Sequence, residues 1–282
     1  MTTPGEFEVL SCPRCGAGTT LPLKSADELA AYYPSGYQAY EATEGGTLGA
    51  ISRAIRAWQA FSGFRTPPLS TLRERSPGRA VDVGCGRGDL GAALIERGWT
   101  VTGVEPSPDA CKVAAGRGID ARCGNVAAAG LEEESYDVAS LRHSLEHVSD
   151  PVGDLGGIAR ALRPGGLVLI TVPNFGGWQS RRFGSRWYHL DLPRHRVHFT
   201  QAALRTALES AGLRVAGVST STSTVGLPAS AQYAIAGRCL FPTGMALRVA
   251  SAACVLAYPV AWPLDRLGGG DQLHAVAYRV RG

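Results

Sequence analysis

The stretch that most constrains this chain is VDVGCGRGDLGAAL, residues 81–94. A short β-branched run ends in glycines at alternate positions, Gly84, Gly86 and Gly88, and an apolar pattern with helical spacing follows at once. This order predicts a strand, a tight turn and the start of a helix. Glycine permits positive φ and close approach of a ligand, and a helix N-terminus offers free N–H groups. We therefore expect a cofactor at this turn.

Strand and helix patterns alternate along the middle of the chain. One helix is expected to begin at Asp150-Pro151, where Asp caps the first turn and Pro occupies it. Such alternation predicts an α/β fold with a parallel sheet, and it places a ligand at the carboxyl ends of the strands. The expected strands are 80–83, 100–104, 121–123, 136–141 and 167–172.

The C-terminal third should complete this sheet. A helix capped by Thr200 is expected to run to about residue 211, followed by a strand over 213–218. Residues 219–235 are rich in Ser and Thr, which favours a loop. The last run, HAVAYRV, alternates as a strand does.

An apolar insertion, residues 236–268, precedes that last strand. Its longest apolar run covers 16 residues and contains Pro259 and Pro263, whereas a membrane-spanning helix needs about 20 residues. We expect a buried or interfacial helical segment, with contact to a membrane surface or a homodimer face as alternatives.

Composition excludes some classes of protein. The net charge of +4 over 282 residues is too small to indicate nucleic-acid binding. The first residues, MTTPGEFEVL, lack the basic and apolar regions of a secretory signal. Seven cysteines, odd in number and scattered, fit a reducing compartment better than a disulfide framework. These features predict a cytoplasmic protein.

Two segments precede the expected α/β domain, which covers 76–282. Residues 1–25 carry Cys12-Pro-Arg-Cys15, half of a zinc ribbon; no second CxxC follows, so we expect a degenerate ribbon, with a metal or a redox pair as alternatives. Residues 26–75 predict a helical cap whose YYPSGYQAY cluster either closes over a ligand or packs in the core.

The glycine turn alone leaves two cofactors open. Gly86 to Gly91 matches GxGxxG, and Glu105 ends the next expected strand, where an acid would bind ribose hydroxyls in an NAD enzyme. S-adenosylmethionine (SAM) also needs close backbone approach and a carboxylate for its ribose. The other motifs must decide between the two.

Those motifs resemble a known family. VDVGCGRGDL, GVEPSPDA, YDVASLRHSLEHVSDP and LRPGGLVLITVPN, in this order and spacing, look like the successive motifs of class I SAM-dependent methyltransferases, of the ubiquinone-type and methyltransferase-23-like subgroup. The resemblance covers about residues 78–218. It implies a Rossmann-like, seven-stranded, mostly parallel sheet with the last strand antiparallel.

The resemblance also implies roles for individual residues. The glycine turn would surround the methionine part of SAM, Glu105 would hold the ribose, and Asn125 would lie near adenine, although the family often has an acid there. The end of the fourth strand would close the site beneath the methyl group. The implied cofactor-binding residues are Asp82, Gly84, Cys85, Gly86, Gly88, Glu105, Pro106, Ser107, Asn125, Val126, Leu141 and Arg142.

Methyl transfer from a sulfonium needs alignment of the nucleophile and, for a hydroxyl acceptor, removal of a proton. Histidine is the side chain best suited to that proton at neutral pH. The candidate bases are His143, His147, His189 and His195, with His198 as a further one.

The HSLEH segment, residues 143–147, allows a metal as an alternative. It matches the HxxEH pattern of some zinc proteases, but that chemistry expects a helix, and here the segment directly follows an expected strand. Ubiquinone-type enzymes carry an ExxEH cluster there that binds a divalent cation; Glu146 and His147 match it, and His143 replaces the first Glu. We expect no bound metal, with Glu146 and His147, or the CxxC pair, as the weaker alternatives.

The loop after the fifth strand, residues 187–200, should line the acceptor pocket, because function concentrates on such loops. Asp191 and Arg194 would either contact the acceptor or form a salt bridge that shapes the loop, and Arg181, Arg182 and Arg186 could bind an anionic acceptor. We expect O-methylation of a secondary metabolite, sugar, quinone or lipid-linked substrate. An NAD-dependent oxidoreductase and a non-catalytic binding partner are the alternatives.

Overall fold

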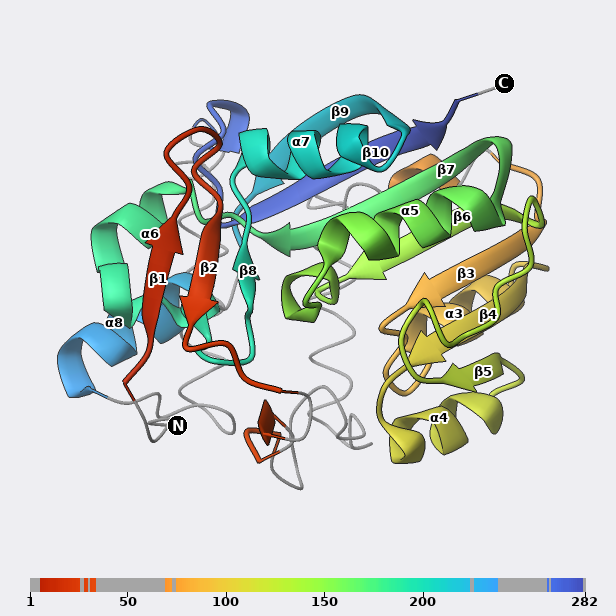
Figure 1. Ribbon diagram of the computed structural model, residues 1–282, viewed down its shortest axis with the longest axis horizontal. Helices are drawn as coiled ribbons and strands as arrows, with labels where there is room; N and C mark the ends of the chain where they lie inside the picture. Colours follow the sequence, from red (N-terminus) through yellow and green to blue (C-terminus); the bar gives the residue numbers. More distant parts are fainter. Residues whose placement is uncertain are drawn as a thin grey trace.

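The computed structural model describes residues 6–25, 28–29, 31–33, 69–72, 75–223, 226–237, 263 and 265–280. Its centre is a seven-stranded sheet in the order β5-β4-β3-β6-β7-β10-β9 (Figure 1). Only β10 runs antiparallel to its neighbours, which confirms the predicted Rossmann-like α/β fold. The strands are β3 Arg79–Val83, β4 Thr100–Glu105, β5 Asp120–Cys123, β6 Tyr136–Arg142, β7 Leu162–Pro173, β9 Leu213–Ser221 and β10 Gln272–Arg279.

Helices cover both faces of the sheet. On one face, α5 (Pro151–Ala161) and α7 (Gln201–Ser210) bury Leu155 and Leu204 against the sheet, and Figure 1 shows both helices on the same side. On the other face, α3 (Asp89–Ile95) and α4 (Pro108–Ala115) bury Leu94 and Ala114 in a second cluster. The remaining elements are α6 Trp178–Phe183, α8 Gly226–Ala236, and the short 3-10 turns η2 Leu69–Leu72, η3 Leu145–His147, η4 Gly184–Arg186 and η5 Tyr188–Leu190.

Both predicted helix starts are confirmed. The side chain of Asp150 accepts a hydrogen bond from Gly153 N at the start of α5, and Pro151 is the first helical residue. Thr200 caps α7 in the same way by accepting from Ala203 N. These caps satisfy N–H groups that have no partner within the helix.

The N-terminal segment is a β-hairpin that joins a second sheet. Strand β1 (Glu8–Ser11) pairs with β2 (Gly18–Leu21), and β2 pairs with β8 (Val197–His198). The hairpin turn holds Cys12 and Cys15 (Figure 1 shows β1, β2 and β8 side by side). Sequence patterns did not predict this pairing, because two-residue β8 is too short to show any periodicity.

Two predicted boundaries are wrong. The segment predicted as a loop, 219–235, contains the end of β9 and helix α8, because Ala229 and Ser230 are buried and packing overrides the Ser/Thr-rich composition. Strand β7 begins at Leu162, five residues before the predicted start, and passes through the Pro-Gly-Gly stretch with a shift in its register against β6.

The cysteines also differ from expectation at one place. Cys111 in α4 and Cys123 at the end of β5 form a disulfide, with Cα atoms 6.0 Å apart. Parallel pairing of β4 and β5 brings the end of β5 beside α4, the helix that follows β4. The spacing of the two cysteines in the sequence does not by itself indicate this contact. Cys12, Cys15 and Cys85 are free.

Most of the predicted cap, 26–75, and most of the apolar insertion, 236–268, lie outside the described residues, so both remain predictions. Among the helices that the structure describes, none is long and apolar enough to span a bilayer.

Leu204 offers a test of this packing, because its side chain is completely buried between α7 and the sheet. Replacing Leu204 by Ala should lower the free energy of unfolding by about 3 kcal/mol, through lost burial and a residual cavity. Denaturant unfolding measures this change. The neighbouring exposed residue provides the control: Arg205→Ala should change stability by less than about 0.5 kcal/mol. Equal effects of the two substitutions would contradict the packing described.

Candidate active site

The glycine turn adopts the conformation that its sequence predicts. The φ angles of Gly84, Gly86 and Gly88 are 73°, 54° and 82°. Residues that carry a side chain rarely adopt such angles. Gly84 also lies so close to Ser144 that an added Cβ would come within 2.4 Å of the Ser144 side chain. Ser144 in turn donates its hydroxyl to Val83 O at 2.7 Å. Two loops thus meet closely at the carboxyl end of β3.

Glu105, at the end of β4, joins the turn to the next loop. Its carboxylate accepts Gly86 N at 2.9 Å through one oxygen and Ser107 N at 2.9 Å through the other. Ser107 then caps α4, with Pro108 as the first helical residue. The side chain of Glu105 is almost completely buried. A ribose bound here would meet an acceptor already held in place by backbone N–H groups.

The other predicted cofactor residues lie at the same edge of the sheet. Gly124 N donates to Glu105 O at 3.0 Å, which brings Asn125 and Val126 next to the end of β4. Asn125 Oδ1 accepts from Ala128 N at 3.0 Å, so this part of the amide is engaged within its own turn. Leu141 pairs in register with Val83, next to the glycine turn. The structure therefore brings the predicted cofactor residues together around one edge.

Asp82 is the ionisable group buried beneath the turn. Burial raises the pKa of Asp82 to about 6, against the opposing effects of the Arg142 and Ser140 side chains. A carboxyl group whose pKa is raised by burial becomes ionised more easily when a cation lies beside it, because the cation favours the charged carboxylate.

His143 stands at the end of β6 in a left-handed conformation, with φ 53°. Its Nδ1 lies 3.5 Å from Glu146 Oε1, and its Nε2 lies 3.4 Å from Gln272 Nε2. The His143 side chain is 41% exposed, whereas that of Glu146 is 2% exposed. Positive φ is uncommon for a residue with a side chain, and here it occurs directly after the carboxyl end of β6.

Glu146 is buried without a close hydrogen-bond donor among the described residues. At 3.5 Å its contact with His143 is an ion-pair distance rather than a good hydrogen bond. Burial raises the pKa of Glu146, but the rings of His143 and His147 outweigh burial, so the pKa lies below its usual value. The carboxylate is therefore charged at neutral pH and faces imidazole rings.

His147 and His195 complete this group, with ring centroids 4.7 Å apart. His147 Nδ1 lies 3.0 Å from Arg194 O, and His195 Nδ1 lies 2.8 Å from His189 O. A carbonyl oxygen only accepts, so both Nδ1 atoms carry hydrogen, and Nε2 is the nitrogen of each ring that can offer a lone pair. Burial, and then the rings of His147 and His198, hold the pKa of His195 well below its usual value.

Three groups converge here in a way that suits a cation. Glu146, His147 and His195 each offer one atom that could bind a metal, and these three atoms lie within 4.8 Å of one another. The His195 Nε2 to Glu146 Oε1 distance is 4.0 Å. A carboxylate and two imidazoles, with each Nδ1 held by a backbone carbonyl, form the kind of donor set that binds divalent transition metals. The HSLEH segment forms a 3-10 turn and not the helix of a zinc protease.

His189 lies apart from this group. Its Nε2 is 3.3 Å from Asp271 Oδ2, and Asp271 is completely buried. The Asp271 carboxylate also accepts Ser223 N at 2.6 Å and Ser223 Oγ at 2.8 Å. Of the four predicted bases, three cluster around Glu146, and the ring of His189 pairs with Asp271 instead.

The loop residues Asp191 and Arg194 form a salt bridge with each other, which was the alternative to contact with the acceptor. Arg194 also donates to Tyr32 O at 2.9 Å, and the Tyr33 hydroxyl lies 3.2 Å from His147 Nδ1. The first tyrosines of the predicted cap therefore contact the site. The rest of that tyrosine cluster lies outside the described residues.

Asp271 and Gln272 were missed by the sequence analysis. Gln272 is the first residue of β10 and Asp271 directly precedes it. Because β10 runs antiparallel, its start lies at the edge where the parallel strands end. The polar pair DQ before an apolar alternating run would have been the signal, once the antiparallel direction was taken into account.

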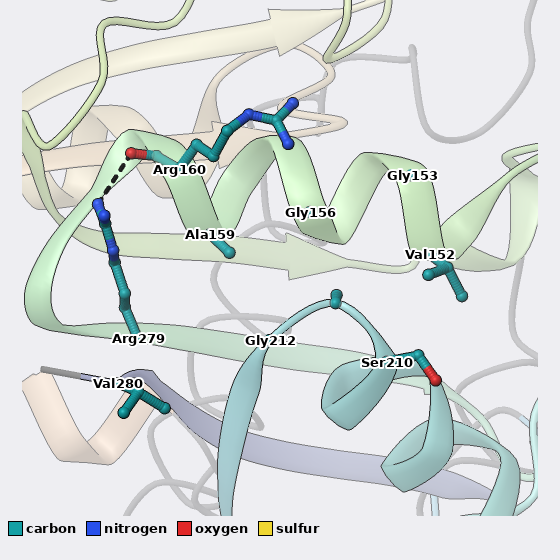
Figure 2. A pocket seen from close by; sticks show the side chains of 10 residues that line it. Val152, Gly153, Gly156, Ala159, Arg160, Ser210, Gly212, Arg279 and Val280 are labelled. Atoms are coloured by element: carbon teal, nitrogen blue, oxygen red, sulfur yellow. Dashed lines mark hydrogen bonds between the residues drawn. The ribbon is translucent and has the colours of Figure 1, made fainter. Parts of the chain in front are cut away.

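A groove of about 480 Å³ lies elsewhere, between α5 and the end of α7 (Figure 2). Gly153 and Gly156 line it on one side and Gly212 on the other, with Arg279 donating to Arg160 O at 3.0 Å. It contains no predicted site residue. The histidine cluster and the glycine turn therefore form the candidate active site, and this groove is separate from them.

The chain is similar to known methyltransferases. Residues 57–218 match a family model described as a methyltransferase domain. A ubiquinone biosynthesis O-methyltransferase of Idiomarina loihiensis is 39% identical over 103 residues, which cover 34% of this chain and 42% of that protein. The corresponding protein of Xanthomonas euvesicatoria is 30% identical over 173 residues, which cover 57% of this chain and 72% of that protein.

Solved structures agree with the fold. Geranyl diphosphate C-methyltransferase of Streptomyces coelicolor has a TM-score of 0.54 at 18% identity, covering 88% of each chain. The methyltransferase in complex with the Trm112 activator of Haloferax volcanii also has a TM-score of 0.54, at 17% identity, covering 83% of this chain and 97% of that one. At these identities the likeness concerns the fold.

The pKa of Asp82 allows a test of the cofactor site with SAM, the cofactor that the resemblance implies. In the free protein Asp82 is protonated below about pH 6, and cationic SAM favours the carboxylate, so binding should release a proton there. SAM affinity should therefore rise several-fold between about pH 5 and pH 7. Calorimetric titration measures it. Asp82→Asn, which cannot ionise, is the control and should bind more weakly with a flatter pH dependence. An equal slope in both proteins would contradict the assignment.

Asp82 also affects stability in the absence of ligand. The pKa of Asp82 in the folded protein is raised above that of a solvent-exposed aspartate, about 3.9. The stability that protonated Asp82 contributes is therefore fully present below about pH 4. The contribution is lost as pH rises toward about 6. A bound cation opposes this loss, because it favours the charged carboxylate.

The family match contains every predicted cofactor residue, from Asp82 to Arg142. It therefore decides between the two cofactors that the glycine turn left open, in favour of SAM. The chain belongs to the methyltransferase domain family and is a class I SAM-dependent methyltransferase.

Proposed function

We propose that this enzyme transfers the methyl group of SAM to an oxygen atom of a small-molecule acceptor, and that His143 removes the acceptor's proton. The observation that carries the proposal is the pairing of an exposed imidazole with a buried carboxylate: His143 Nδ1 lies 3.5 Å from Glu146 Oε1. His143 also follows β6 directly, where the resemblance puts the methyl group.

The chemistry follows from this pair. Nδ1–H of His143 points toward the Glu146 carboxylate, which leaves Nε2 to take the proton from the acceptor hydroxyl. The acceptor oxygen then forms a bond to the methyl carbon while the carbon–sulfur bond breaks, and neutral S-adenosylhomocysteine leaves. The positive charge moves from sulfur to imidazolium, and the buried negative charge of Glu146 stabilises it. The required alignment comes from the turn and the loop on either side.

An oxygen acceptor is supported by the relatives, whose names give O-methylation in ubiquinone biosynthesis. Phenols, quinone precursors, sugars and lipid-linked hydroxyls all fit this proposal. Arg181 and Arg182, in the last turn of α6, supply positive charge on the loop side for an acceptor with an anionic group.

A second candidate is cation-assisted transfer, favoured by the convergence of Glu146, His147 and His195. These three residues would hold a divalent cation. When bound, the cation lowers the pKa of a coordinated hydroxyl, so that less basic groups suffice to deprotonate it. Two imidazole nitrogens favour zinc, cobalt or nickel over magnesium.

Replacement of His143 tests the first candidate. Asn tolerates the left-handed conformation, so His143→Asn should keep the fold and SAM affinity while turnover falls by roughly 10²- to 10⁴-fold. Labelled SAM with a panel of phenols, glycosides and polyprenyl lipids measures the transfer. His189→Asn is the matched comparison, and we expect a smaller loss because that ring pairs with Asp271. A larger loss in H189N than in H143N would assign the base to His189.

Metal analysis tests the second candidate. After incubation with zinc and desalting, the wild-type protein should retain about one cation per chain if the cluster binds one. H195A should then lose the cation. C12S is the control, because it removes the other possible ligand pair and should leave the cation bound. Zinc-free wild-type protein, or retention in H195A, would rule the cluster out as a metal site.

A further inference from the structure

We propose that the N-terminal hairpin, β1 and β2, is a positioning element of the acceptor site, and that Thr20 is the residue through which it orients His195. The proposal rests on the proposed function for its catalytic consequence. The hairpin was predicted as a separate, degenerate zinc ribbon, and nothing in its sequence connects it with the histidines. In the structure it is paired with the loop that carries them.

Thr20 makes three hydrogen bonds to this loop. Its backbone N–H donates to Arg196 O at 3.0 Å. Its hydroxyl donates to His195 O at 2.6 Å and lies 2.9 Å from His198 Nε2. Thr20 is 3% exposed. Residues 175 positions apart in sequence are therefore joined by buried polar contacts, which cost stability when one partner is removed.

The geometry determines where the hydrogens lie. A hydroxyl has one hydrogen, and the carbonyl of His195 can only accept, so the Thr20 hydroxyl gives its hydrogen to that carbonyl. The contact with His198 must then have Nε2–H as the donor and Thr20 Oγ1 as the acceptor. Burial lowers the pKa of His198 to about 4, so the ring is neutral and has this one tautomer.

His195 is consequently held at three points. Thr20 fixes its carbonyl, Asp191 O accepts its backbone N–H at 3.1 Å, and His189 O accepts its Nδ1–H at 2.8 Å. Its remaining nitrogen, Nε2, lies 4.0 Å from Glu146. Of these three hydrogen bonds, the one to Thr20 comes from outside the loop that carries His195, and its loss leaves the two bonds made within that loop.

A second contact ties the hairpin turn to the same region. Thr200, the cap of α7, donates its hydroxyl to Cys15 O at 2.6 Å. Gly18 pairs with His198 and is so closely packed that an added Cβ would lie 2.6 Å from Val9 and 3.1 Å from His198. The hairpin is thus fixed at its turn and along β2, so it can transmit a restraint to the loop.

The test uses the full-length protein and three substitutions. Thr20→Val keeps the shape and removes the hydroxyl, and Thr20→Ser keeps the hydroxyl. Thr19→Val is the matched control, because Thr19 is exposed on the same strand. NMR of the histidine ring nitrogens reports which nitrogen carries hydrogen, and calorimetry gives SAM affinity.

We expect T20V to shift the ring signals of both His195 and His198 and to remove the single tautomer of His198. T20S and T19V should leave these signals as in the wild type. With an acceptor that the wild type methylates, T20V should lower kcat on the order of tenfold at unchanged SAM affinity, and T20S should restore it.

Unchanged His195 signals in T20V would overturn the proposal, as would signals that change equally in T19V. If T20V does not fold, Thr20→Ala takes its place, because it also removes the hydroxyl and should shift the same His195 and His198 ring signals. If no acceptor is methylated even by the wild type, the proposed function fails, while the ring signals still decide whether Thr20 positions His195.

Discussion

The site depends on the carboxylate of Glu105. Its two oxygens accept N–H groups from Gly86 and Ser107, and so hold the loops after β3 and β4 against each other. Each of these N–H groups would otherwise need another partner near the buried sheet edge. Three features lie around this carboxylate. They are the positive φ angles of the turn glycines, the cap of α4 by Ser107, and the hydrogen bond from Gly124 N to Glu105 O.

A second carboxylate, Glu146, organises the acceptor side by a different principle. It is buried and charged, yet it lacks a close donor among the described residues, so its charge acts on the surrounding imidazoles. Backbone carbonyls set the tautomers of His147 and His195, and Glu146 faces His143 across 3.5 Å. One buried charge can thus serve either a base or a cation, which is why Glu146 belongs to both candidates for the chemistry.

The sequence allowed much of the fold and of the cofactor side to be predicted, because those elements are local. The glycine turn, Glu105 and the caps at Asp150 and Thr200 depend on neighbours within a few residues. The acceptor side was only partly predicted, because its partners are distant: Thr20 meets His195, and Gln272 meets His143. Helix α8 was not predicted, because the Ser/Thr-rich composition of this segment favours a loop. Burial of Ala229 and Ser230 against the rest of the protein outweighs that preference, and composition does not show burial.

The position of β10 between β7 and β9 has a consequence for how the enzyme assembles. Its pairing joins Leu273 to Val172 and to Thr220, so the strand fills a place left open by earlier parts of the chain. Contacts of such sequence separation form late, because the loops they close are long. Until residues 271–279 have emerged from the ribosome, β9 lacks the strand with which it pairs, and the carboxylate of Asp271 is missing. During synthesis, cofactor-side contacts can form first, whereas the acceptor side must wait for the last strand.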